Sequence, residues 1–123
     1  MSCDDLDSHV EPLSVTNWED SRTVVLAPAG ELDMLSSHDA WSIAERTLRR
    51  AGNRVVVLDL TAVSFLDSHG IGTLVRVAES ANRLGLRLRL VVRSTQQARR
   101  SIELCGVHHV IDTYESVEQA LAA

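Results

Sequence analysis

Lysine is missing from this sequence, because all 12 residues of the lysine and arginine class are arginine. A Walker A loop holds nucleotide phosphates with a lysine, a protein kinase needs a lysine on a strand, and Schiff-base enzymes react through a lysine amine. The absence of lysine therefore excludes these three kinds of active site.

The low content of aromatic residues and cysteine, the lack of long apolar stretches and the net charge narrow the possible classes of protein further. Aromatic residues make up 3% of the chain, so aliphatic side chains must fill the core. Cys3 and Cys105 do not predict a structural disulfide, because one lies in an acidic tail and the other near a helix end. No apolar stretch is long enough to span a membrane and no signal segment opens the chain, so we expect a cytoplasmic protein. The formal net charge of -5 argues against direct binding of nucleic acid.

The chain length and the order of its elements predict one α/β domain. The 123 residues suffice for one core. Residues 1–11 are acidic and are expected to form a flexible tail, and residues 12–123 the domain. Strands are expected at 13–18, 23–29, 55–60, 86–92 and 110–112, with helices from about 36 or 37 to 51, 68–84, 94–105 and 116–122. This alternation predicts a mostly parallel sheet with right-handed crossovers.

Turns, helix caps and side-chain directions are also predicted at several positions. Residues 30–33, Gly-Glu-Leu-Asp, are expected to turn the chain. Ser37, and either Ser94 or Thr95, are expected to cap helices, and Leu121 is expected to face inward. The strand at 86–92 alternates, which predicts that Arg87 and Arg89 point outward.

The stretch VSFLDSHGIG, residues 63–72, has the features of a strand that feeds a helix. Its simplest interpretation is that Asp67 or Ser68 caps the helix and that the glycines permit a tight turn. Gly70 and Gly72, however, each cost the first turns of a helix up to ~1 kcal/mol relative to alanine. Small residues here let another protein approach closely, and a serine at the positive end of a helix is a suitable phosphoryl acceptor.

On these residues the chain resembles the STAS family, the sulphate-transporter and anti-sigma-factor-antagonist domains, and specifically its small single-domain bacterial antagonists. The resemblance runs from about Leu13 to Ala122. Its most specific parts are Gly30-Glu31-Leu32-Asp33 and the stretch VVLDLTAVSFLDSHGIG from Val56 to Gly72. The family pattern is an aliphatic strand followed by Asp-Ser-(Ser or Thr)-Gly-(Leu or Ile)-Gly. The resemblance implies a small, mixed, mostly parallel sheet with about four helices packed mainly on one side.

The resemblance also implies a partner-switching mechanism in place of an enzymatic activity. The unmodified protein would bind an anti-sigma factor that is a serine kinase of the histidine-kinase-like ATPase fold, and so release a sigma factor. The kinase would phosphorylate Ser68, and a metal-dependent serine phosphatase would reset it. No cofactor is implied, and the residues implied in partner binding are Asp33, Asp67, Ser68, His69, Gly70 and Ile71.

Several of these residues also have simpler interpretations. Asp67 is a capping acid that, by similarity, would also orient Ser68, and Asp33 is a turn residue whose counterpart in relatives lies near the acceptor. Gly70 is expected to be structural and to keep the surface low, whereas Ile71 also falls on the inner face of the expected helix. His69 departs from the family pattern, so it is either a variable turn residue or an ionisable group that perturbs phosphorylation.

Other functions stay open. One is a scaffold subunit of a larger stress-signalling assembly; others are nucleotide or small-molecule binding or hydrolysis, and an accessory role to a transporter. Gly70-Ile71-Gly72 is too short for a dinucleotide fingerprint, and the Gly-x-Ser-x-Gly motif of a hydrolase is absent. Cys105, His108 and His109 have zinc-ligand side chains, but no fourth ligand is evident, so we predict no metal site.

Overall fold

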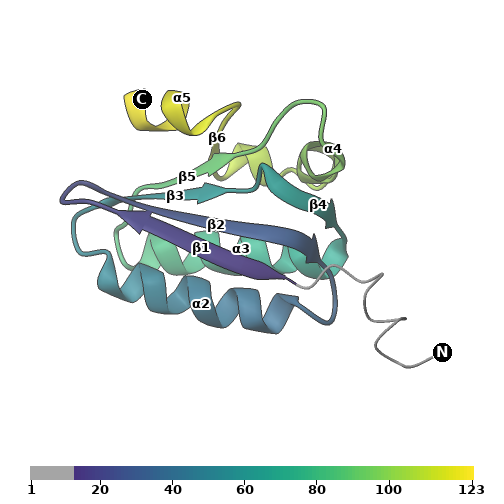
Figure 1. The fold of residues 1–123 in the computed structure, drawn as a ribbon, viewed down its shortest axis with the longest axis horizontal. Coiled ribbons are helices and arrows are strands. Elements are labelled where there is room, and N and C mark those ends of the chain that lie inside the picture. Colours follow the sequence, from purple (N-terminus) through teal and green to yellow (C-terminus); the bar gives the residue numbers. More distant parts are fainter. Residues whose placement is uncertain (1–12) are drawn as a thin grey trace.

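The structure, a computed structural model, describes residues 13–123 and consists of a six-stranded sheet with helices on both faces (Figure 1). The strand order is β1-β2-β3-β5-β6, with β4 also paired to β2. β1 is antiparallel to β2, and the other pairings are parallel. The strands are β1 (Ser14–Glu19), β2 (Thr23–Leu32), β3 (Val55–Asp59), β4 (Ala62–Leu66), β5 (Leu88–Val91) and β6 (Asp112–Tyr114). This mixed, mostly parallel sheet confirms the predicted fold class.

The helices are distributed unequally over the two faces of the sheet. They are α2 (Ser37–Arg50), α3 (Ser68–Arg83), α4 (Gln97–Leu104) and α5 (Val117–Ala122), with a short 3-10 helix, η1 (Val107–His109), after α4. Figure 1 shows α2 and α3 along one face and α5 on the other. Side chains of α2, α3, α4 and η1 join the larger apolar cluster, whereas α5 contributes to a small second one. The helices therefore pack mainly on one side, as predicted.

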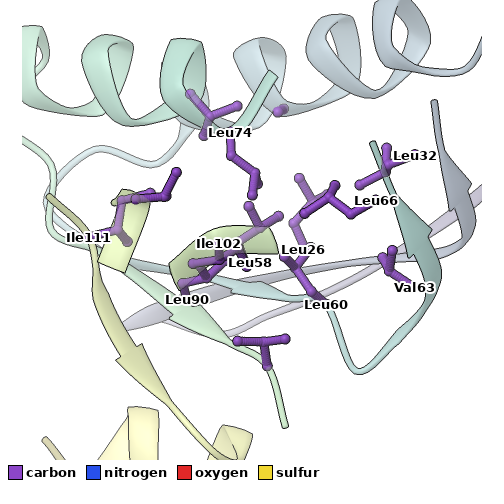
Figure 2. Close-up of a cluster of buried hydrophobic side chains, with 14 of the residues drawn as sticks. Leu26, Leu32, Leu58, Leu60, Val63, Leu66, Leu74, Leu90, Ile102 and Ile111 are labelled. Carbon is purple, nitrogen blue, oxygen red and sulfur yellow. The ribbon is translucent and has the colours of Figure 1, made fainter. Parts of the chain in front are cut away.

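The central strand β3 is buried on both faces, as its continuous apolar sequence predicts. Val56 and Leu58 point into the larger cluster, and Val57 points into the small cluster beneath α5. Figure 2 shows Leu58 in the larger cluster with Leu90 of β5 and Ile102 of α4. Alternation of side chains along a strand thus lets one apolar run serve two layers.

The ten-residue strand β2 organises the sheet, because β3 and β4 both pair with it in parallel. β3 pairs with its first half, at Thr23–Leu26, and β4 with its last residues, 29–32. The expected turn at residues 30–33 is therefore wrong for its first three residues. Gly30 has a φ of 108°, and the register with β4 shifts between Gly30 and Glu31. Such a bulge bends the strand without ending it.

Other expectations differ from the structure at the ends of elements. β4 and η1 were not predicted, and β6 begins at the last residue of the strand expected at 110–112. Ser37 is the first helical residue of α2, and α4 starts after Gln96, so neither Ser94 nor Thr95 caps it. Leu121 is 41% exposed. The expected tail, residues 1–11, and residue 12 lie outside the described residues.

Candidate functional site

The amino-terminal end of α3 is capped by the acid that precedes it. Asp67 Oδ1 accepts hydrogen bonds from the backbone N–H groups of His69 (2.9 Å) and Gly70 (3.1 Å). The Asp67 N–H donates to the Leu32 carbonyl (3.2 Å), which ties the start of α3 to the end of β2. A side-chain cap satisfies amides that have no partner within the helix, so the capping role of Asp67 is confirmed.

Ser68 is the first residue of α3, and its side chain is exposed. Among residues 13–123 no side chain or backbone group forms a hydrogen bond with its hydroxyl. The Asp67 carboxylate accepts hydrogen bonds from the amides of His69 and Gly70 and makes none with Ser68. In the structure Asp67 therefore caps the helix and makes no contact that would orient the serine hydroxyl. An exposed hydroxyl without a partner at a helix terminus is accessible to a modifying enzyme.

Glycine occurs at positions 70 and 72 of the motif for two different structural reasons. A Cβ atom at Gly70 would lie 2.4 Å from Leu66 Cδ1 and 2.5 Å from the Leu32 carbonyl oxygen, so this position must be glycine for α3 to approach the sheet. Figure 2 shows Leu32 and Leu66 next to each other at the ends of β2 and β4. Gly72 is exposed, and a Cβ atom there would meet nothing within 4 Å.

The burial of Gly70 and of Ile71 corrects two expectations about the exposed surface. Gly70 is buried, so it does not shape the exposed surface; Gly72, one helical turn beyond Ser68 on the same face, keeps that surface low. Ile71 is 9% exposed and belongs to the core, which leaves its side chain unavailable to a partner. Within residues 67–72, which match the Asp-Ser-x-Gly-x-Gly pattern, the exposed residues are Ser68, His69 and Gly72.

The loop between β2 and α2 lies beside the start of α3, because Leu32 and Leu66 are partners in the strand register. Asp33 Oδ1 accepts hydrogen bonds from the N–H groups of Leu35 (3.0 Å) and Ser36 (3.2 Å), so Asp33 has a structural role in this loop. The loop leaves Met34 65% and Leu35 81% exposed. Two large apolar side chains in solvent next to a serine motif are typical of a docking surface.

Two glutamines that the sequence analysis did not single out hold β4 in place. Gln97 accepts a hydrogen bond from Leu66 N–H through Oε1 (3.0 Å) and donates to the Leu66 carbonyl through Nε2 (3.1 Å). Gln96 Nε2 donates to the carbonyls of Leu60 (3.0 Å) and Val63 (3.2 Å). These amides take the place of a neighbouring strand on the free side of β4. The adjacent Gln-Gln pair in an otherwise polar helix start gives no local signal of this role.

His69 is exposed, and its Nδ1 lies 3.6 Å from Asp67 Oδ2. When protonated, it therefore neutralises part of the charge of the capping carboxylate. The rings of His108 and His109 contact each other at a tilt, with centroids 3.9 Å apart, and Cys105 is exposed. The described residues contain no group of three or more His, Cys, Asp or Glu side chains arranged to hold a metal ion.

Comparisons with known proteins show which proteins this chain and its fold are similar to. The anti-sigma-F factor antagonist RsfA of Mycobacterium tuberculosis is 26% identical over 113 residues, which cover 90% of this chain and 87% of the relative. A crystal structure of an anti-sigma factor antagonist from Mycobacterium paratuberculosis has a TM-score of 0.81 at 23% identity, over 90% of this chain and 92% of that one.

A further structural neighbour is the Bacillus cell fate determinant SpoIIAA in its phosphorylated form, with a TM-score of 0.65 at 19% identity over 89% of this chain and 97% of that one. No helix within residues 13–123 is both long and apolar enough to cross a membrane. The family model described as the STAS domain matches residues 15–120, which is most of the chain. The chain therefore belongs to the STAS domain family.

Proposed function

We propose that this protein is an anti-sigma factor antagonist that binds an anti-sigma factor serine kinase, thereby releases a sigma factor, and is switched off by phosphorylation on Ser68. The observation that carries the proposal is the exposed Ser68 hydroxyl at the first residue of α3, which forms no hydrogen bond with any group of residues 13–123. The proposal draws support from relatives that are named antagonists and from a neighbour of the same fold that exists in a phosphorylated form. The role is regulatory, without catalysis by this chain, and it belongs in the cytoplasm, where sigma factors act.

The proposed kinase-binding surface combines the exposed part of the motif with the adjacent loop. It consists of Ser68, His69 and Gly72 of α3 together with Met34 and Leu35. Met34 and Leu35 supply apolar area for burial, and Gly72 lets the partner approach the helix closely. Asp33 and Asp67 support this surface through their bonds to the backbone.

Phosphorylation would change the charge of this surface more than its shape. A phosphoserine carries about -1.5 to -2 charges at neutral pH. At position 68 it would lie next to the Asp67 carboxylate, which already occupies the amides of His69 and Gly70. The helix end therefore stabilises the phosphate only slightly, and kinase binding would have to remove water from two adjacent anions. A penalty of ~3–4 kcal/mol would weaken binding several hundredfold.

The test measures the affinity of the cognate kinase, purified from the native cell by capture on the wild-type protein, for a set of variants. We expect Ser68→Ala to bind like the wild type and to resist release by ATP, whereas Ser68→Glu should bind at least tenfold more weakly. Ser21→Glu is the matched control, because Ser21 is exposed at the opposite end of the sheet. It should bind like the wild type.

Intact-mass and peptide mass spectrometry after incubation with the kinase, ATP and magnesium should place one phosphate on Ser68. The serine phosphatase of the metal-dependent class should remove it and restore binding. Phosphate on another residue, or unchanged affinity of Ser68→Glu, would contradict the proposal.

A further inference from the structure

Three arginines each stand directly before a parallel strand. Arg22 precedes β2, Arg54 precedes β3 and Arg87 precedes β5. Because these strands are neighbours, the sheet brings the three residues together at its amino-terminal edge, at the left of Figure 1. The backbone fixes their spacing, since Val55 N–H donates to the Arg22 carbonyl (2.9 Å) and Val56 N–H to the Arg87 carbonyl (2.9 Å).

A fourth arginine from the interior of β5 joins them. Arg22, Arg54, Arg87 and Arg89 line one cavity of about 420 Å³, to which Asn53 also contributes. This arginine cavity lies at the opposite end of the sheet from Ser68. Its volume falls within the range of about 300–1,000 Å³ typical of small-molecule sites.

Positive charge in the arginine cavity exceeds the negative charge paired with it. Among residues 13–123, only Arg54 of the four has a carboxylate within ion-pair distance, Glu19 at 3.3 Å. Asp20 is also close, but its Oδ1 accepts hydrogen bonds from the N–H groups of Arg22 and Thr23 (2.8 Å each). Asp112 is the strand partner of Arg89 and makes no ion pair with it. Three of the four guanidinium groups therefore make no ion pair among residues 13–123, although the net charge of the chain is -5.

Two of the four side chains are fixed and two are exposed. Arg54 donates to the carbonyls of Ala51 (3.0 Å) and Arg50 (2.9 Å), and Arg89 Nη1 donates to the Ala120 carbonyl (2.7 Å). Arg89 is half-buried and, like Arg87, lies on the strand face away from Leu88 and Leu90 of the larger cluster, as predicted. Arg22 and Arg87 are exposed and have no side-chain hydrogen bond within the described part of the chain.

We propose that the arginine cavity is a binding site for a small molecule that bears a phosphate or pyrophosphate group. Guanidinium groups present planar pairs of donors that match phosphate oxygens, and fixed arginines lose little entropy on binding. Arg54 and Arg89 form the rigid wall, Arg22 and Arg87 close over the anion, and Asn53 supplies a further amide donor. The site is separate from the Ser68 surface, so the proposal is independent of the proposed function.

Calorimetric titration of the full chain with inorganic pyrophosphate, without divalent cations, tests this site. We expect one saturable site whose affinity falls with increasing salt, and backbone amide NMR shifts concentrated at residues 21–23, 53–55 and 87–89. Arg22→Gln and Arg87→Gln should each weaken binding about tenfold or more, because each removes charge-assisted hydrogen bonds to the anion. ATP and citrate titrations then show whether the site prefers a nucleotide phosphate or a carboxylate.

Two controls separate this site from general attraction of anions. Arg100→Gln removes an exposed arginine of α4 that lies outside the arginine cavity and should leave binding unchanged. Ser68→Glu blocks anions from the start of α3 and should also leave it unchanged. No saturable binding at millimolar pyrophosphate, equal loss in Arg100→Gln, or loss in Ser68→Glu would each overturn the proposal. Thermal unfolding of every variant should match that of the wild type, because the substituted side chains are exposed.

Discussion

Substitution of the two motif glycines by alanine should have opposite effects on stability. In Gly70→Ala, the new Cβ atom would lie 2.4 Å from Leu66 Cδ1 and 2.5 Å from the Leu32 carbonyl oxygen. Leu66 is 1% exposed and cannot swing into solvent. The Leu32 carbonyl is a backbone atom that also accepts the Asp67 N–H, so α3 itself has to move away.

The magnitude depends on two opposing terms. Overpacking of this kind costs about 1–3 kcal/mol, and the backbone contact favours the upper part of that range. Alanine regains up to about 1 kcal/mol of helix propensity, so we expect a net loss of about 2 kcal/mol in the free energy of unfolding. In Gly72→Ala the overpacking term is absent, because nothing lies within 4 Å, and only the gain of up to about 1 kcal/mol remains.

Urea unfolding followed by circular dichroism measures both changes, and thermal unfolding gives a second estimate. For a domain of this size, 1 kcal/mol corresponds to about 3–6 °C in Tm. Gly70→Ala should therefore melt about 6–12 °C below the wild type, and Gly72→Ala a few degrees above it. A Gly70→Ala protein as stable as the wild type would refute the packing argument. Equal destabilisation by both variants would refute the distinction between a buried and an open glycine.

Two further substitutions test how the rest of the site is held. Gln97→Leu removes both side-chain bonds to Leu66 and leaves the buried Leu66 N–H without its side-chain acceptor, although the Ser101 hydroxyl still donates to the Leu66 carbonyl (3.5 Å). It should cost about 1–3 kcal/mol in urea unfolding, whereas Gln97→Glu keeps the acceptor and should cost less. Asp67→Ala removes the cap of α3 and should lower the free energy of unfolding by about 0.5–2 kcal/mol. Asp67→Asn retains an accepting oxygen and should recover most of that loss. Equal stability of the Ala and Asn variants would contradict the capping role.

The parts of the fold that depend on local patterns were predictable from the sequence. β3 is a continuous aliphatic run, and α3 combines a capping acid with apolar residues at helical spacing and a glycine after its end. These signals are contained within about twenty consecutive residues, so no distant contact is needed to interpret them. The same holds for Asp67, whose capping role depends on the next three residues.

The parts that depend on distant contacts were not predictable. β4 is a strand because residues 29–32 of β2 and the side chain of Gln97 satisfy its backbone, and neither partner is close in sequence. The sequence predicts a turn at residues 30–33, whereas β2 continues through Leu32, because the bulge between Gly30 and Glu31 lies where β2 pairs with β4. The burial of Gly70 likewise depends on Leu32, which lies far from it in the chain.

The presence of both buried and exposed residues in the first turns of α3 has an evolutionary consequence. Gly70 and Ile71 are constrained by the core, while Ser68 and His69 before them and Gly72 after them are exposed to solvent. Paralogues that coexist in one cell can therefore diverge at 69 and 72 to avoid cross-talk, without altering the scaffold that presents the shared serine. The departure at His69 is the kind of change that such insulation between parallel pathways would use.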